Sequence, residues 1–423
     1  MRKVRSPWAW IPTVYIFEGL PNAIVNTVSL IVFKNMGMPN DRLTLYTSLL
    51  SFPWILKIVL SPVVDTSWGK RGWTAAMQFL MVVCTCVLGL TLPHCPLSLI
   101  LVLFLVTAFA SSIHDIAADG FYMLGLDDHT QSLFVGVRNT FFRLALLCGQ
   151  GLLAIMAGVF QKRGCDAVLS WSWTLTGCSA VMALIALWDA VSMPRPPADG
   201  PRGADGGFRG AMKDLGRLFV TFMQKKEIVV AVTFMLLYRL PEAFSLKILI
   251  PFLKDAREVG GLAMDDVQVG LANGTIGVVA LLLGGILGGL AGGKWGLRRC
   301  LLPMSLSLAL PCCVYLYLAL AQPSGVLPVY ICIAVDQFGY GFGFTAYTLY
   351  MLYFSRGDYQ TSHYAFCTVL MTFSMMLPGL VAGRIQLSIG YPAFFVMVMA
   401  CCIVTVAVTL LARRNIDPSY GRK

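Results

Sequence analysis

The chain has 423 residues, of which 57% are apolar and only 13% are charged, whereas average soluble domains have about 45–50% and about 25%. A water-soluble fold of this size needs a charged exterior, so the composition excludes an ordinary soluble protein and favours one that is solvated by lipid. The formal net charge of +11 would suit a nucleic-acid-binding protein, but the distribution of the basic residues follows membrane topology instead.

Twelve apolar stretches are each long enough to cross a bilayer, which takes roughly 20 residues. In chain order they cover 8–33, 43–64, 74–93, 97–125, 133–160, 168–192, 227–253, 266–292, 300–321, 326–354, 362–386 and 390–412. The first of them is too long for a signal peptide and has no small-residue cleavage site, so we interpret it as a membrane span. We therefore expect an all-α membrane protein with two six-helix bundles, at 1–192 and 227–423, joined by a linker at 193–226.

The basic residues are concentrated on one side of these spans. Only six of the 32 Lys and Arg fall in the loops of the other side: Lys34, Arg42, Lys162, Arg163, Lys254 and Arg257. The positive-inside rule then places both termini in the cytoplasm and the chain in a plasma-type membrane. Nucleic acid is not needed to explain the charge, and the lipid bilayer is the expected partner.

The linker from Met193 to Lys226 is rich in Pro and Gly at first, and from Phe208 onward it is amphipathic and basic. This second part is either a helix on the anionic inner leaflet or a solvated connector.

Most of the 13 Cys lie within apolar runs. Only Cys95 and Cys165 lie in outer loops, where we expect free thiols rather than a disulfide. No metal-ligand spacing occurs, and we expect neither a metal nor a cofactor.

The two halves repeat short motifs in the same order. "GLPNA" at Gly19 matches "RLPEA" at Arg239, "VVDTSWGKRGW" corresponds in position to "AGGKWGLRRC", and "YMLGLDDHTQS" at Tyr122 matches "YMLYFSRGDYQTS" at Tyr350. Matches in register and in the same orientation indicate a parallel duplication of six spans, because an odd number would invert the second copy. This architecture resembles that of the major facilitator superfamily.

The segment "D-x-x-x-G-K-R" resembles the signature loop of that superfamily between its second and third helices. The resemblance implies that Asp65, Lys70 and Arg71 form a cytoplasmic gate that latches the helix ends in the outward-open state. The signature has a basic residue directly after the acid. This chain has Thr66 there, which implies a weaker latch.

Charged residues within membrane spans are costly, by at least about 2.5–3.5 kcal/mol each, so each must face a partner or a water-filled cavity. Those within the expected spans are Glu18, Asp115, Asp119, Glu242 and Asp336 against Lys57, Arg138, Arg143, Arg239, Lys247 and Arg384. Each is either a structural ion pair or part of a site, and for Lys57 and Arg384 we favour the structural role. Buried carboxylates can carry protons, whereas Arg and Lys bind anions. We therefore expect proton-driven import of an anion, with Asp115, Asp119 and Glu18 in proton coupling.

Polar residues four apart share one face of a helix, and they form stripes in several spans. Glu18, Asn22 and Asn26 share one such face. The superfamily resemblance implies that the first, fourth, seventh and tenth helices line the transport path. The residues that we expect to bind substrate are Asn22, Asn26, Tyr122, Arg138, Arg143, Arg239, Glu242, Lys247, Asp336 and Tyr340. His114 is either a proton relay or a structural hydrogen-bonding residue.

Within that superfamily the chain resembles the AmpG-type muropeptide permeases, and more distantly the acetyl-CoA transporters. The resemblance rests on "GLPNAIV", "LKIVLSPVVDTSWGKRGW", "ASSIHDIAADGFYMLGL", "LYRLPEAFSLKILIPFL", "VGLANGTIGVVALLLGGIL" and "AVDQFGYGFGFTAYTLYML". It implies proton-driven import of anionic GlcNAc-anhydroMurNAc peptides across the bacterial inner membrane for cell-wall recycling. The residues it carries over are Asp115, Asp119, Arg143, Arg239, Glu242 and Asp336. The family pattern has Lys, Asp and Glu at the last three of these, so the charge is kept there. At two other positions a cation is lost, because Tyr122 and Gly274 stand where the family pattern has Lys.

These two differences leave other substrates open, namely a siderophore, an acyl-CoA-like anion or a drug. A polytopic membrane acyltransferase would need catalytic His, Ser or Asp residues clustered at one membrane face. The four His residues are instead scattered through the chain. We expect a transporter rather than an enzyme, and a monomer.

Overall fold

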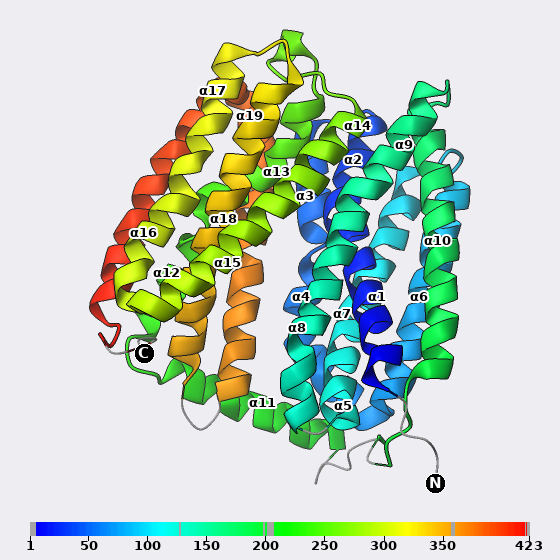
Figure 1. Cartoon of the computed structure of the whole chain (residues 1–423), viewed down its shortest axis with the longest axis vertical. Coiled ribbons are helices and arrows are strands. Elements are labelled where there is room, and N and C mark those ends of the chain that lie inside the picture. The colour runs from blue at the N-terminus through cyan, green and yellow to red at the C-terminus, as the bar shows by residue number, and fades with distance from the viewer. Residues whose placement is uncertain are drawn as a thin grey trace. The chain divides into compact units, whose positions relative to one another are not determined.

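The computed structural model describes residues 6–126, 128–197, 199–200, 207–356, 360–418 and 420. Within these ranges the side chains at 65–66, 128–133, 135–136, 139, 207–209, 211 and 360–362 are not described. Every element in the described ranges is a helix (Figure 1). Ten helical segments there are long and apolar enough to cross a membrane, and a bent pair, Asn40–Ile55 with Lys57–Val64, adds an eleventh. The chain is therefore an all-helical, multi-pass membrane protein.

One of these segments is too long for a single crossing. His363–Arg414 has 52 residues, which is about 78 Å of helix at 1.5 Å per residue against a hydrocarbon core of about 30 Å. At Gly390 the backbone is not helical (φ 77°, ψ 168°), in a region that glycine adopts readily. The two arms beside Gly390 correspond to the last two predicted spans, so the structure is consistent with twelve.

The chain folds as two compact units, the first comprising Met1–Met36 and Leu50–Asp214, the second Gly37–Leu49 and Leu215–Lys423. The α-helices up to α10 are α1 (Ile11–Ala23), α2 (Ser29–Asn35), α3 (Asn40–Leu49), α4 (Phe52–Ile55), α5 (Lys57–Ser67), α6 (Lys70–Thr91), α7 (Leu97–Gly125), α8 (Asp128–Leu147), α9 (Leu153–Lys162) and α10 (Ala167–Ser192). The others are α11 (Gly207–Met223), α12 (Ile228–Leu237), α13 (Leu240–Lys254), α14 (Asp266–Val269), α15 (Gly277–Trp295), α16 (Leu297–Ala309), α17 (Cys313–Ala321), α18 (Val326–Ser355) and α19 (Gln360–Arg414). The 3-10 turns are η1 (Pro7–Ala9), η4 (Arg257–Val259) and η6 (Leu310–Cys312), and the π-helical turns are η2 (Ile24–Val28), η3 (Cys148–Leu152) and η5 (Gly270–Ile276).

In the first unit, α1 packs closely against α8 and η3 because two glycines leave room for it. A Cβ atom on Gly149 would lie 2.3 Å from the Cβ of Ala23, and one on Gly19 would lie 2.6 Å from the Cβ of Ala145. Real Cβ atoms do not approach so closely, so only glycine permits this crossing. The close approach fixes the position of α1, which carries several of the predicted site residues.

The matching prolines of the two halves interrupt their helices. Pro21 lies in α1, and the helix widens into the π-helical turn η2 directly after Ala23. Pro241 lies in the first turn of α13, and the seventh predicted span breaks before it, between α12 and α13. Proline removes one backbone donor and crowds the preceding turn, which accounts for both interruptions.

The second predicted span, 43–64, is also not one straight helix. It consists of α3, the short α4 and α5, with a bend of 42° between Asn40–Ile55 and Lys57–Val64. Its first part belongs to the second unit, where it packs on α13 and α19. There the Thr44 hydroxyl accepts the Gly383 N–H at 3.0 Å, and Asn40 donates to Gln386 at 2.7 Å.

In the second unit, α15 and α18 meet along glycines of the eighth predicted span. A Cβ on Gly284 would lie 2.1 Å from the Phe338 carbonyl oxygen, and one on Gly288 would lie 2.7 Å from the Thr345 hydroxyl. A second row of glycines runs beside this one, one position further along the chain. It is different, because a Cβ on Gly289 or Gly293 would meet nothing within 4 Å. One glycine row thus serves close helix packing, and the other does not.

Candidate functional site

The first unit gathers charged side chains from four helices. Tyr15 and Glu18 lie on α1, and Asp115 and Asp119 lie one turn apart on α7. Lys57 is the first residue of α5, directly after the bend in the second span, and Arg138 lies on α8. These six residues are the acid cluster referred to from here on.

Two of the three carboxylates in the acid cluster are paired with cations. The Lys57 ammonium donates to Asp115 Oδ2 at 2.6 Å. Arg138 Nη1 lies 3.0 Å from Asp119 Oδ1, and the Tyr15 hydroxyl donates to the same oxygen at 3.0 Å. All of these side chains are partly buried, so the pairs are shielded from bulk water and hold their helices in register.

Glu18 is the third carboxylate, and no cation within the described ranges pairs with it. Oxygens of Glu18, Asp115 and Asp119 lie within 4.8 Å of one another. The Glu18 Oε2 atom is buried and has no hydrogen-bond partner in the described part of the chain. With all three acids ionised, the cluster would carry one uncompensated negative charge, which is unfavourable within a membrane span. Chemically, it can accept one proton or a small cation. Because Lys57 and Arg138 already occupy the cluster, we keep the prediction that no metal binds.

Of the other polar residues predicted on the stripe of Glu18, Asn22 lies on α1 and Asn26 lies in the π-helical turn η2. Asn26 Nδ2 donates to the Asn22 carbonyl oxygen at 3.1 Å, and Ser51 donates to Asn26 Oδ1 at 3.3 Å. His114 is fully buried beside the ring of Phe17, and neither of its ring nitrogens has a hydrogen-bond partner among the described residues.

The position of Tyr122 explains one difference from the family pattern. The Arg138 guanidinium lies over its ring, 5.3 Å from the centroid, and over the Tyr15 ring at 4.8 Å. Arg138 therefore places a positive charge where the family pattern has Lys. Arg143, further along α8, is exposed and has no ion-pair or hydrogen-bond partner within the described part of the chain.

In the second unit, a buried arginine and aromatic rings form a separate group. Arg239 donates from Nε and Nη2 to the two Glu242 oxygens, at 2.8 and 2.7 Å, and from Nη2 to the Tyr340 hydroxyl at 3.1 Å. Its guanidinium lies 4.9 Å from the ring centroid of Phe344 and 5.9 Å from that of Tyr347. This fork is possible because α13 begins at Leu240, which brings Arg239 and Glu242 onto one turn.

Two other predicted residues of this unit lie apart from Arg239. Asp336 Oδ2 accepts hydrogen bonds from the Tyr315 hydroxyl at 2.6 Å and from Gln337 at 3.1 Å. Lys247, which is 6% exposed, donates to the Thr47 carbonyl oxygen at 3.2 Å, near the carboxyl end of α3. A cation is favourable at a helix carboxyl terminus, so this contact accounts for Lys247 structurally.

The backbone of the two basic residues in the expected gate binds a carboxylate that the sequence analysis did not identify. The Lys70 and Arg71 N–H groups, at the amino terminus of α6, donate to the two carboxylate oxygens of Asp199 at 2.6 and 3.1 Å. Arg71 Nη2 also donates to the Ala190 carbonyl at 2.5 Å. An anion at a helix amino terminus is favourable. The Asp65 side chain lies outside the described residues, so its part in the gate stays a prediction.

Sequence reasoning missed Tyr15, Phe344 and Asp199 as members of these groups. Tyr15 precedes Glu18 by three positions, and Phe344 follows Tyr340 by four, so helical spacing was the available signal for both. Lys57, which we expected to be a structural ion pair, is paired with Asp115 and so belongs to the acid cluster. Cys95 and Cys165 are both free thiols.

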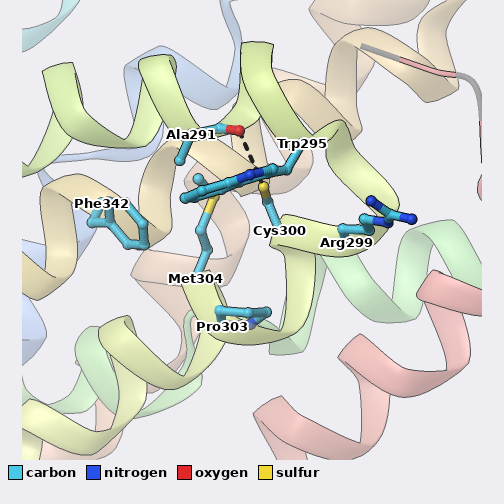
Figure 2. Close-up of a pocket in the computed structure, with 7 residues that line it drawn as sticks. All are labelled: Ala291, Trp295, Arg299, Cys300, Pro303, Met304 and Phe342. Carbon is cyan, nitrogen blue, oxygen red and sulfur yellow. Dashed lines mark hydrogen bonds between the residues drawn. The ribbon is translucent and has the colours of Figure 1, made fainter. Parts of the chain in front are cut away.

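A small cavity of about 130 Å³ lies elsewhere in the second unit, between α15, α16 and α18 (Figure 2). Its lining includes Trp295, Met304 and Phe342, and Cys300 donates to the Ala291 carbonyl at 3.3 Å beside it. The cavity is smaller than the several hundred Å³ typical of ligand pockets, and none of the predicted site residues lines it. It is therefore not part of the candidate site.

Comparison with known proteins gives consistent results over nearly the whole chain. An anhydromuropeptide permease of Escherichia coli is 22% identical over 414 residues, which cover 95% of this chain and 78% of that protein. "Putative transporter AmpG 2" of Rickettsia typhi is 23% identical, covering 89% of each chain. A bacterial homologue of the human lysosomal transporter Spinster has the same fold, with a TM-score of 0.69, 13% identity and 98% coverage of both chains. The sequence profile of the Major Facilitator Superfamily matches residues 13–377, and the chain belongs to this superfamily of transporters.

Proposed function

We propose that the chain is a proton-coupled transporter that imports anionic muropeptides across the bacterial inner membrane by alternating access. The observation that carries this proposal is the acid cluster, in which three carboxylates share two cations. Glu18 is the carboxylate without a cation in the described ranges, so a proton bound there balances the cluster. Releasing that proton restores the charge imbalance, which is the property a proton-coupled transporter needs.

Positive charge is available for an anionic cargo. Arg143 is exposed and without a partner among the described residues, and Arg239 lies among aromatic rings that suit the faces of sugar rings. The GlcNAc-anhydroMurNAc peptides combine an anionic stem peptide with sugars. The name of the Escherichia coli relative, an anhydromuropeptide permease, supports the same cargo.

A different cargo remains the second candidate, and Gly274 favours it. This residue lies in the π-helical turn η5 and stands where the AmpG pattern has Lys. Among the other cargoes that the sequence leaves open, a neutral or cationic drug would need less positive charge here than a muropeptide.

The decisive experiment measures uptake of labelled GlcNAc-anhydroMurNAc tripeptide into proteoliposomes with and without an inward proton gradient. We expect accumulation only with the gradient, and abolition by a protonophore. Transport of an iron chelate or a drug, with no muropeptide uptake, would reject the cargo but not the coupling. Gradient-independent muropeptide uptake would reject the coupling but not the cargo.

A further inference from the structure

The amphipathic helix α11 is anchored to the second unit along one side. The Phe222 ring packs against Phe354, His363 and Phe366, with centroid distances of 5.7, 5.6 and 5.4 Å. The Thr221 hydroxyl lies 3.1 Å from His363 Nε2. These contacts hold the carboxyl-terminal half of α11 against the ends of α18 and α19, where Figure 1 shows it running across them. This half of α11 is therefore not a loose connector.

A second side of α11 is apolar and about half exposed. Phe219 is 50% exposed and Met223 is 45% exposed, and the two are four positions apart, on one face of the helix. Val220, beside them, is 51% exposed. The Phe219 ring contacts the edge of the Phe366 ring, with centroids 5.6 Å apart, and half of its surface stays exposed. Three large apolar groups on one helix would be unfavourable in water.

Cations lie beside this apolar stripe. Lys213 and Arg217 are exposed and four positions apart, so they share a face next to that of Phe219 and Met223. Asp214 is exposed on the side of the helix opposite the stripe. An apolar face flanked by cations matches the boundary between lipid tails and anionic headgroups.

The position of α11 along the chain places this face at the membrane surface. The membrane-spanning helix α12 begins at Ile228, only four residues after α11 ends at Met223. Lys225, within that short connection, donates to the Arg356 carbonyl oxygen at 2.6 Å, which ties the connection to the end of α18. Lipid is therefore within reach of the stripe.

We propose that α11 is an interfacial helix that inserts Phe219 and Met223 into the adjoining leaflet, while Lys213 and Arg217 bind anionic phospholipid headgroups. The sequence left a lipid-bound helix and a solvated connector as alternatives. The one-sided anchoring by Phe222, together with the apolar stripe on another side, favours the lipid-bound helix. The inference is independent of what the protein transports.

The test uses the full chain in nanodiscs that contain equal amounts of phosphatidylglycerol and phosphatidylcholine. Phe219→p-azidophenylalanine introduces a photoreactive group of nearly the same shape, and Met223→p-azidophenylalanine provides a second position in case the first fails to fold. After irradiation, mass spectrometry identifies the adducts. We expect lipid adducts at both positions and at least tenfold fewer at the control, Asp214→p-azidophenylalanine.

The headgroup preference is tested separately. In the Phe219 variant we expect phosphatidylglycerol adducts to exceed phosphatidylcholine adducts. Arg217→Gln should reduce this ratio by about fivefold, since each cation near an anionic surface contributes about 1 kcal/mol. Adducts only to other parts of the protein or to water, or equal lipid labelling at Asp214, would overturn the interfacial assignment. An unchanged lipid ratio in Arg217→Gln would overturn the headgroup contact.

Discussion

Replacing Glu18 with Gln tests the charge balance of the acid cluster most directly. Oxygens of the three carboxylates lie within 4.8 Å of one another, so two ionised members repel by about 3.5 kcal/mol at an effective dielectric constant of about 20. In the mechanism that we propose, a bound proton relieves this repulsion in the wild type. The Gln side chain relieves it permanently and is close to Glu in shape. We therefore expect Glu18→Gln to stay in its proton-loaded form, insensitive to the gradient.

The assay compares two modes of transport in the same proteoliposomes. Gradient-driven accumulation of labelled muropeptide should fall to the level reached without a gradient, whereas exchange of internal for external muropeptide should continue. Glu18→Asp, which keeps an acid at this position, is the matched control and should retain part of the gradient-driven uptake. Normal accumulation by Glu18→Gln would refute the assignment of the proton to this residue.

Three further predictions follow from other contacts. Asp115→Asn and Asp119→Asn should each abolish gradient-driven uptake without loss of membrane insertion, because each leaves the cluster balanced without a proton; normal coupling in both would remove them from this role. Arg239→Lys should raise the KM for muropeptide about tenfold at unchanged proton stoichiometry, because a single ammonium cannot reproduce the two-pronged hydrogen bond to Glu242 that positions the cation; an unchanged KM would argue against a role of Arg239 in substrate binding. Gly149→Ala should destabilise the protein by about 1–3 kcal/mol, because its Cβ has no room. The measurement is the thermal unfolding midpoint in detergent, and Gly177→Ala, which meets nothing within 4 Å, should leave that midpoint unchanged.

The fold was largely predictable because length and apolar content alone specify a membrane helix. The exceptions occur where the backbone deviates from regular helix. The bend after α4 divides the span predicted at 43–64, and hydropathy did not mark it, although Pro53 in the first turn of α4 was an available signal of a helix break. The break at Gly390 was predicted, since the last predicted span begins at this residue.

The site was less predictable, because helical spacing shows which residues share a face but not which helices meet. It placed Arg239 beside Glu242, and the two form an ion pair. Asn26 also contacts Asn22, whereas the grouping of both with Glu18 stays a prediction. Helical spacing had no means of pairing Lys57 with Asp115, 58 positions away. That pairing depends on the bend that places Lys57 at the start of α5, so the unpredicted bend and the unpredicted partner have one cause.

The repeated proline motif shows how the two halves came to carry different chemistry. In the first half Gly19 precedes Pro21 and lets α1 approach α8, so the motif contributes a close packing contact beside the acids. In the second half the corresponding residue is Arg239, and the broken helix lets its guanidinium hold Glu242 among aromatic rings. One backbone feature thus supports an acid-rich group in one copy and an arginine in an aromatic setting in the other. Since a proton and an anion need opposite charges to bind them, this divergence suits a transporter that holds the proton at the acid cluster of the first half and binds the anion through Arg239 of the second half together with Arg143.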